Sequence, residues 1–192
     1  MQTISRENFV KNTNATLFVY NKFIETYNTL KDSDLVKKYD GKAVNKRFTD
    51  KVNPTLPIGM RIEIKDDWNG YAIHLYFDRY GMDSEALKAI EDIELRKAVN
   101  NLSYDTCNEK LYPTRDRKYI TSDRVFNVEQ FNKDIEDRIK VLQDWVKDYQ
   151  RGVDEVEITY QKYADLKNHV EKVLQSVPQC LRNYINIQNP LY

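Results

Sequence analysis

The chain contains few of the residues that interrupt regular structure or build redox and metal sites. It has 5 glycines, 5 prolines, 2 cysteines and 2 histidines among 192 residues. The low glycine and proline content leaves little room for disordered linkers. Cys107 and Cys180 lie too far apart in the sequence to form a paired metal-binding motif. They are typical of free thiols in a reducing compartment, and we expect a cytoplasmic protein.

The sequence also lacks an excess of charge and a long apolar run. Thirty basic residues balance thirty acidic residues, so the formal net charge is zero. Proteins that bind nucleic acid are usually visibly basic, and this balance argues mildly against that class. The longest apolar stretch, Ala15–Tyr20, is too short to cross a bilayer, and the N-terminus has no basic region followed by an apolar run. We expect no membrane partner.

No complete catalytic or cofactor-binding motif is present. The sequence lacks a phosphate-binding glycine loop, a dinucleotide fingerprint, a GxSxG motif, an HExxH motif and a paired CxxC. His74 is expected on the polar face of a hairpin and His169 on a solvated helix, while Cys107 has no histidine near it in the sequence. The acidic groups Asp66-Asp67 and Glu91–Glu94 fit solvated turns and helix faces better than a cation site. We expect no enzymatic activity, cofactor or metal.

Three N-terminal helices are predicted before a break in the pattern. Apolar side chains on one face predict a helix over Ser5–Leu30. Asp32–Asp34 offers an N-cap for a short helix that Gly41 stops, and a further short helix is expected over Ala43–Val52. Two prolines and a glycine within Asn53–Gly59 then exclude a helix there.

The clearest local pattern predicts a β-hairpin. Arg61–Lys65 and Tyr71–Phe77 alternate apolar and polar residues on either side of Asn69-Gly70. Asparagine and glycine tolerate the positive φ angles of a two-residue hairpin turn. Counting outward from that turn places Ile64 opposite Leu75 on an apolar face. A slip by one residue would exchange the two faces of the hairpin.

The hairpin is expected over about residues 60–78. The region that follows it is less regular. Asp83 or Ser84 is expected to cap a helix that runs to about Leu102. The following segment has no clear period, and Lys118–Thr121 is a candidate third strand because a two-stranded hairpin alone is barely stable. The buried candidates of the helix are Leu87, Ile90, Ile93 and Leu102.

The last third of the chain, Asn127–Val177, carries one apolar stripe of helical period. Asn127 is expected to be the N-cap, with Gln130 completing a capping box. Steps of three and four residues are typical of a helix that packs along another long element, although Lys167 falls at a position where an apolar residue is expected. The stripe comprises Val128, Phe131, Ile135, Ile139, Leu142, Val146, Tyr149, Val153, Val156, Tyr160, Tyr163, Val170, Leu174 and Val177.

Gly152 leaves two alternatives for this stripe. As a helix terminator followed by a new cap at Asp154, with Glu157 three residues later, it favours two helices folded into an antiparallel hairpin. The stripe nevertheless crosses Gly152 without a stutter, and one interior glycine costs only about 1 kcal/mol. We favour the hairpin, which would bury the stripe, because stop and cap residues coincide. A continuous helix would expose the stripe and favour a homodimer through the C-terminal helices.

Together these elements predict an α+β fold that is mostly helical. In residues 1–126, N-terminal helices surround a β-hairpin or a three-stranded antiparallel sheet. In residues 127–192, a long antiparallel helical hairpin precedes a short helix that begins at Pro178. The second region is expected either to pack with the first as one domain or to form a protruding arm.

Two basic stretches, residues 37–51 and 111–119, are candidates for nucleic-acid contact, because basic residues bind phosphates and aromatic rings stack on bases. Lysines and tyrosines are plentiful throughout the chain, and solvated surfaces explain the same residues without a ligand. Trp145 flanks the long stripe and is a candidate anchor for a protein partner. The candidates within the two stretches are Lys37, Lys38, Lys42, Lys46, Arg47, Lys51, Tyr112, Arg115, Arg117, Lys118 and Tyr119.

The leading functional hypothesis is a non-enzymatic interaction protein. Fourteen tyrosines and a low glycine content are typical of AT-rich coding sequences, so one form of the hypothesis is a phage or mobile-element factor that binds and modulates a host protein. The alternative is a nucleic-acid-binding accessory protein that uses residues 37–51 and 111–119. An enzyme built on the acidic groups or on Cys107 ranks last.

Overall fold

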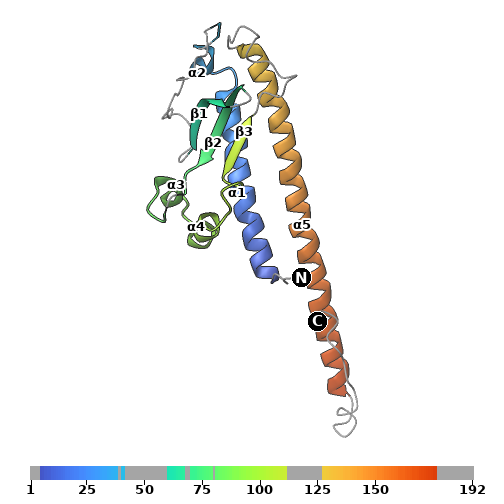
Figure 1. The fold of residues 1–192 in the computed structure, drawn as a ribbon. Coiled ribbons are helices and arrows are strands. Elements are labelled where there is room, and N and C mark those ends of the chain that lie inside the picture. The colour runs from blue at the N-terminus through green and yellow to red at the C-terminus, as the bar shows by residue number, and fades with distance from the viewer. Residues whose placement is uncertain are drawn as a thin grey trace. The chain divides into compact units, whose positions relative to one another are not determined.

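A computed structural model describes residues 5–38, 40–41, 60–67, 70–79, 81–111 and 127–176, with the backbone alone in 60–67 and 70–73. The described part of the chain is mostly helical and contains one small antiparallel sheet (Figure 1). It divides into two compact units, Met1–Arg151 and Gly152–Tyr192, and the boundary falls inside the last helix. Among the described helices, none combines the length and the apolar content that a bilayer crossing requires.

Helix α1, Arg6–Leu30, confirms the first predicted helix. The Ser5 hydroxyl accepts a hydrogen bond from the backbone amide of Asn8 at 3.3 Å, and this N-cap starts the helix. Helix α2, Asp34–Lys37, follows where a short helix was expected. Gly41 has a φ of +68°, a conformation that glycine adopts without strain. The short helix predicted over residues 43–52 lies outside the described residues.

Strands β1, Met60–Asp67, and β2, Gly70–Phe77, form the predicted antiparallel hairpin. Their register differs from the prediction by two residues, because Ile64 lies opposite Ile73. Gly70 is already paired within β2, so the predicted two-residue turn that includes Gly70 is wrong. A shift of two residues does not change which positions of a strand share a face. The apolar–polar alternation excludes a slip by one residue but cannot detect a slip by two.

A third strand, β3, Asn108–Leu111, pairs antiparallel with β2, so that the sheet order is β1-β2-β3. Glu109 and Leu111 are buried, whereas the two residues that alternate with them are half-buried. The segment has the sequence Asn-Glu-Lys-Leu, which has no apolar alternation that could have predicted a strand. The candidate strand at Lys118–Thr121 lies outside the described residues.

The single helix predicted from Ser84 to about Leu102 is two short helices, α3, Glu85–Lys88, and α4, Ile93–Asn100. Ser84 caps α3 as predicted, because its hydroxyl accepts a hydrogen bond from a backbone amide of that helix at 3.2 Å. Asp92 then starts α4. Its carboxylate accepts hydrogen bonds at 2.8 and 3.0 Å from the amides of the second and third residues of the helix.

The break between α3 and α4 is stabilised by Arg96. Its guanidinium Nε donates a hydrogen bond at 2.8 Å to the Ile90 carbonyl oxygen, which lies between the two helices. Ile90 is buried as predicted, but Ile93 is 60% exposed and the expectation that it is buried is wrong. Because the chain turns before Ile93, this residue does not share a helical face with Leu87 and Ile90.

Helix α5, Val128–Ser176, continues through Gly152 without interruption. The favoured prediction of a helical hairpin at Gly152 is therefore wrong, and the alternative of a continuous helix is correct. The apolar register across Gly152 is unbroken, and packing that follows such a register readily outweighs about 1 kcal/mol for one interior glycine. Asn127 caps the helix as predicted, with its Oδ1 accepting a hydrogen bond from the Gln130 amide at 2.9 Å. The helix expected from Pro178 lies outside the described residues.

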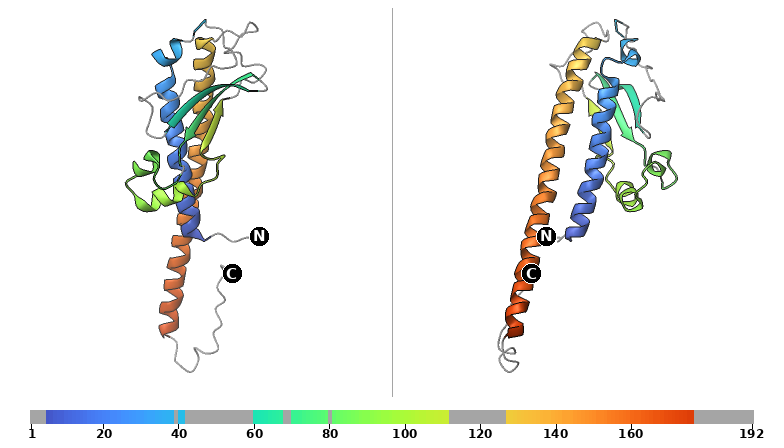
Figure 2. Two further views of the ribbon diagram at one scale, coloured as in Figure 1. Left: turned by 60° about the vertical axis from the view of Figure 1, so that its left-hand side comes forward. Right: turned by 180° about the vertical axis from the view of Figure 1, so that it is seen from behind.

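In the Met1–Arg151 unit, α1 packs across one face of the sheet, and the first part of α5 runs antiparallel beside α1 (Figure 2). Phe18 of α1 meets Phe77 of β2 edge to face, with 5.9 Å between the ring centroids. Asp32, just after α1, accepts a hydrogen bond at 2.7 Å from Asn132, near the start of α5. The core contains Ala15, Val19, Phe23, Tyr27, Leu30, Leu75, Phe77, Leu87, Ile90, Ala98, Val99, Cys107, Leu111, Phe131, Ile135, Ile139 and Leu142.

The capping role of Asp92 is testable by substitution. Asp92→Ala is expected to lower the free energy of unfolding by about 1 kcal/mol, since two amides of α4 lose their acceptor. Glu91→Ala, at the adjacent exposed position, is the control and should change stability by less than about 0.5 kcal/mol. Urea denaturation followed by circular dichroism measures both effects. Equal destabilisation by the two variants would contradict the assignment of Asp92 as the cap.

Candidate functional site

A buried ion pair joins β3 to α5. Glu109 is only 5% exposed. Its carboxylate oxygens accept hydrogen bonds from Arg138 Nε and, at 2.9 Å, from Arg138 Nη2. The Tyr27 hydroxyl of α1 donates to Glu109 Oε1 at 3.4 Å. Three elements thus meet at one carboxylate, and the pair neutralises a charge that burial alone would make costly.

The sequence did not reveal this pair. Glu109 lies in a segment without a clear period, and Arg138 directly precedes Ile139 of the apolar stripe. A single charged residue beside a helical stripe normally remains at the surface. Only the position of β3 against α5, which joins residues 29 positions apart, shows that the two side chains meet.

Aromatic rings surround the outer side of this ion pair. The Arg138 guanidinium lies 4.8 Å from the centroid of the Trp145 ring. Tyr20 contacts both Trp145 and Tyr149, with centroid distances of 5.8 and 5.9 Å. Burial, together with the neighbouring Tyr149 and Glu109, raises the pKa of Tyr20 to about 12. Trp145, the candidate partner anchor, is 40% exposed, but its ring already packs within this unit.

His74 is buried, and the prediction that it lies on a solvated hairpin face is wrong. It is 5% exposed, its Nδ1 lies 3.0 Å from the Tyr76 hydroxyl, and the two rings are stacked. Its cross-strand neighbours are Glu63 of β1 and Lys110 of β3, whereas the predicted register, with Ile64 opposite Leu75, would place Lys65 opposite His74. Because β2 is the central strand, His74 has a neighbouring strand on each side. In a two-stranded hairpin one of these sides would remain exposed to solvent.

Cys107 lines a pocket of about 270 Å³ next to the C-terminal end of β2. Burial raises the pKa of its thiol, and the nearby Arg79 partly offsets this effect. Arg79 is held in place by a hydrogen bond of 2.7 Å from its Nη1 to the Asn100 carbonyl oxygen. A protonated thiol is a poor nucleophile, so the pocket favours packing over covalent chemistry. Its lining consists of Tyr76, Phe77, Asp78, Arg79, Gly81, Tyr104 and Cys107.

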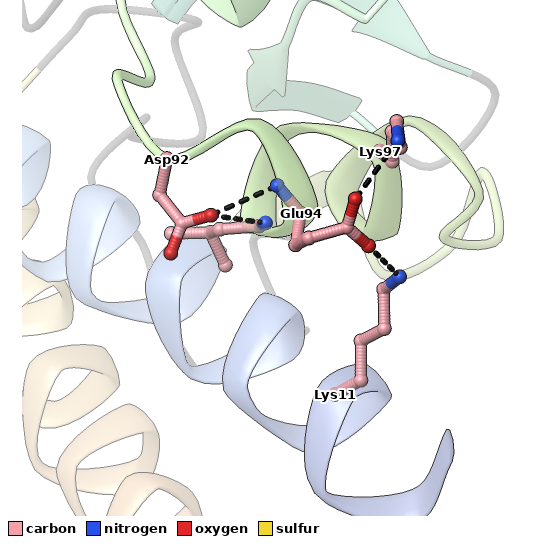
Figure 3. Close-up of polar contacts among 5 residues, drawn as sticks. Lys11, Asp92, Glu94 and Lys97 are labelled. Atoms are coloured by element: carbon pink, nitrogen blue, oxygen red, sulfur yellow. Dashed lines mark hydrogen bonds and ion pairs between the residues drawn. The ribbon is translucent and has the colours of Figure 1, made fainter. Parts of the chain in front are cut away.

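The acidic group around Glu94 is engaged in contacts between and within helices, as Figure 3 shows. Glu94 accepts hydrogen bonds from Lys11 of α1 at 2.6 Å and from Lys97 of α4 at 2.8 Å. These two ammonium groups lower the pKa of Glu94 from 4.5 to about 2. Asp92 is occupied as a helix cap. Across the described ranges, no three histidine, cysteine or acidic side chains are grouped as a metal site requires.

The basic candidates for nucleic-acid contact are mostly not placed. Lys37 and Lys38, at the end of α2, are described and exposed. The remaining basic candidates, Lys42 to Lys51 and Arg115 to Lys118, lie outside the described residues, as do Tyr112 and Tyr119. Whether these side chains share one surface therefore remains a prediction.

The C-terminal part of α5, residues 152–176, exposes large apolar side chains. Ile158 and Leu166 are each 54% exposed, Val173 is 49% exposed and Tyr160 is 46% exposed. Of these four residues only Tyr160 belongs to the apolar stripe, and Ile158 points away from it. Four other stripe residues of this segment are half-buried: Val156, Tyr163, Val170 and Leu174. This is the largest accumulation of exposed apolar side chains in the part of the chain that the structure describes. Such a surface marks a contact with another molecule more often than a solvated face.

Comparison with protein-family models, with characterised proteins and with solved structures finds no match to this chain. Function therefore has to be inferred from the chain's own side chains and surfaces.

The buried ion pair should respond strongly to loss of one partner. Arg138→Met is expected to lower the free energy of unfolding by about 3 kcal/mol, since it leaves the Glu109 carboxylate buried and unpaired. Adding Glu109→Leu should recover most of this loss, because the double variant buries no charge. Arg151→Met is the matched control on the same helix, where the ion pair with Asp148 is exposed and removal should cost less than about 0.5 kcal/mol. Urea unfolding of the wild-type chain and the three variants measures these differences.

The contacts of Glu94 predict a stability difference that depends on pH. Because the folded-state pKa of about 2 lies below the ordinary 4.5, the carboxylate stabilises the fold above pH 4.5. This contribution disappears as the pH falls from 4.5 toward 2. The melting temperature of Glu94→Gln should therefore lie below that of the wild-type chain at pH 7 and converge with it near pH 2. Glu91→Gln should follow the wild-type curve throughout, and a pH-independent difference for Glu94→Gln would contradict the assignment.

Proposed function

We propose that the chain is a non-enzymatic interaction protein, and that the apolar stripe within residues 152–176 of α5, together with the flanking Leu166 and Val173, forms its protein-binding surface. The single observation that carries the proposal is the exposure of large apolar side chains along this segment: Tyr160 of the stripe and Leu166 and Val173, which flank the stripe on one side, are 46–54% exposed. Helical segments of this kind bind partners by laying apolar residues at three- and four-residue steps against a complementary surface.

The polar groups of the Met1–Arg151 unit support this proposal in a second way. Glu109 is paired with Arg138, Glu94 is paired with two lysines, and the Cys107 thiol is buried with a raised pKa. Each of these candidate chemical groups has a structural partner or is unsuited to nucleophilic attack. A phage or mobile-element factor that acts on a host protein is one form of the proposal, suggested by the amino-acid composition.

The matched variants for testing this surface are Tyr160→Glu and Ile158→Glu. Both replace a large apolar side chain by the same charged one, at exposures of 46% and 54%. At about 100° per residue, the two positions point about 160° apart around the helix. Tyr160 belongs to the apolar stripe, whereas Ile158 lies outside it.

The test is affinity capture from host cells that produce a tagged and an untagged copy of the same variant, with and without nuclease. We expect at least one protein, either a host protein or the untagged copy, to be retained by the wild-type chain and by Ile158→Glu. Tyr160→Glu should reduce this retention at least tenfold. Retention that nuclease abolishes would instead support the nucleic-acid alternative, and retention of nothing would overturn the proposal.

A further inference from the structure

The C-terminal segment of α5 has the residue spacing of a coiled coil. Its stripe continues at Val156, Tyr160, Tyr163, Lys167, Val170 and Leu174, with alternating steps of four and three residues. This spacing averages 3.5 residues, the period at which one helix keeps the same seam against a second helix over several turns. A flat surface or a loop would not require this regularity. The pattern therefore favours another α-helix as the occupant of the face.

The other described helices of the chain are either packed elsewhere or too short to supply that helix to residues 152–176. Helix α5 has 49 residues, whereas α1, the next longest, has 25 and already packs on the sheet and on the first part of α5. The remaining described helices have 4 to 8 residues. A helix of matching length and matching heptad spacing is, however, present in every other copy of the chain.

We propose that residues 152–176 of two copies of this protein pack against each other as an antiparallel coiled coil. The proposal rests on the proposed function, since it takes this segment to be the protein-binding surface, and it names the partner as a second copy of the chain. The crossing point lies near residue 165. In this alignment the two segments overlap completely. Val156 then pairs with the partner's Leu174, Tyr160 with the partner's Val170 and Tyr163 with the partner's Lys167.

Lys167 determines the orientation. In a parallel pair it would face the partner's Lys167 in the middle of an apolar seam, which brings two like charges together. In the antiparallel pair it faces the partner's Tyr163, and the partner's Lys167 faces Tyr163 in turn. An ammonium group beside a tyrosine ring is a favourable contact. A charged residue at a single core position commonly selects one arrangement at some cost in stability.

The residues that flank the seam fit the same arrangement on one side. In the antiparallel pair Leu166 meets the partner's Leu166 across the crossing point, which covers a side chain that is 54% exposed in the single chain. Val173, 49% exposed, lies beside the partner's Thr159. On the other side Glu157 meets the partner's Glu171. Salt screens an interaction between two such flanking carboxylates.

The first test measures the mass of the full chain by analytical ultracentrifugation across a concentration series. The wild-type chain and Ile158→Glu should be dimers at micromolar concentration, and Tyr160→Glu should dissociate at least tenfold more readily. Circular dichroism and urea unfolding of each variant verify that the Met1–Arg151 unit remains folded. A wild-type chain that is monomeric at all concentrations would overturn the proposal.

The second test determines the orientation by disulfide formation in a Cys180→Ser background, in which the remaining Cys107 is buried. Val156→Cys and Leu174→Cys are prepared as separate proteins. In the antiparallel pair position 156 faces the partner's position 174, so only a mixture of the two proteins should form an interchain disulfide. In an antiparallel dimer of either protein alone, the introduced cysteines of the two copies lie about 27 Å apart along the helix axis, far beyond the span of a disulfide. Efficient crosslinking of either protein with itself would indicate a parallel pair and overturn the proposal.

The outcomes separate this inference from the proposed function. A monomeric chain that captures a host protein through Tyr160 would retain the proposed function and refute the dimer. A monomeric chain whose Tyr160→Glu variant behaves like Ile158→Glu in both assays would refute both. Protection of the segment by residues 177–192 of the same chain would appear as a monomer whose Tyr160→Glu variant loses stability in urea, and it would also refute the dimer.

Discussion

The arrangement of the Met1–Arg151 unit depends on one carboxylate. Glu109 faces the side of the sheet where α1 packs, and an unpaired charge at such a position would cost several kcal/mol. Arg138 can reach it only if α5 lies at a particular height along β3 and α1 leaves room for the guanidinium. The contacts on either side of the ion pair, Asp32 with Asn132 and Tyr20 with Tyr149, agree with that height. Apolar stripes alone would permit α5 to shift by one turn relative to α1. Such a shift would separate Arg138 from Glu109, so the ion pair excludes it.

The sequence predicts what depends on short-range chemistry. The Ser84 and Asn127 caps, the extent of α1 and the existence of the hairpin all follow from side chains within a few residues of one another. The hairpin register does not, because the two-residue period of a strand is insensitive to a shift by two. The cap at Asp92 is visible in the sequence as well, but a longer helix pattern through Ile93 competes with it and leads to a wrong prediction of burial.

The candidate site was less predictable, because it depends on pairings between distant segments. Nothing local indicates that Glu109 would meet Arg138, or that His74 would become buried once β3 adds a neighbour to β2. At Gly152 the local signals for a helix stop were present, yet the continuous apolar register prevailed. The choice between a hairpin and a continuous helix also determined where a binding surface could be found. A buried stripe would have served only as scaffold, whereas a continuous helix leaves Tyr160 and Leu166 exposed.

The difference in length between α1 and α5 has a consequence for how the chain folds. A helix of about 25 residues with little to pack against is only marginally stable in water, even when its sequence favours helix formation. The first part of α5 packs against other elements of the same chain, so the free energy of this packing does not depend on protein concentration. A segment that gains its packing from a second molecule becomes ordered by a bimolecular step, so its helix content rises with the amount of protein present. The first part of α5 would then be ordered by folding of the single chain, and residues 152–176 by association of two chains.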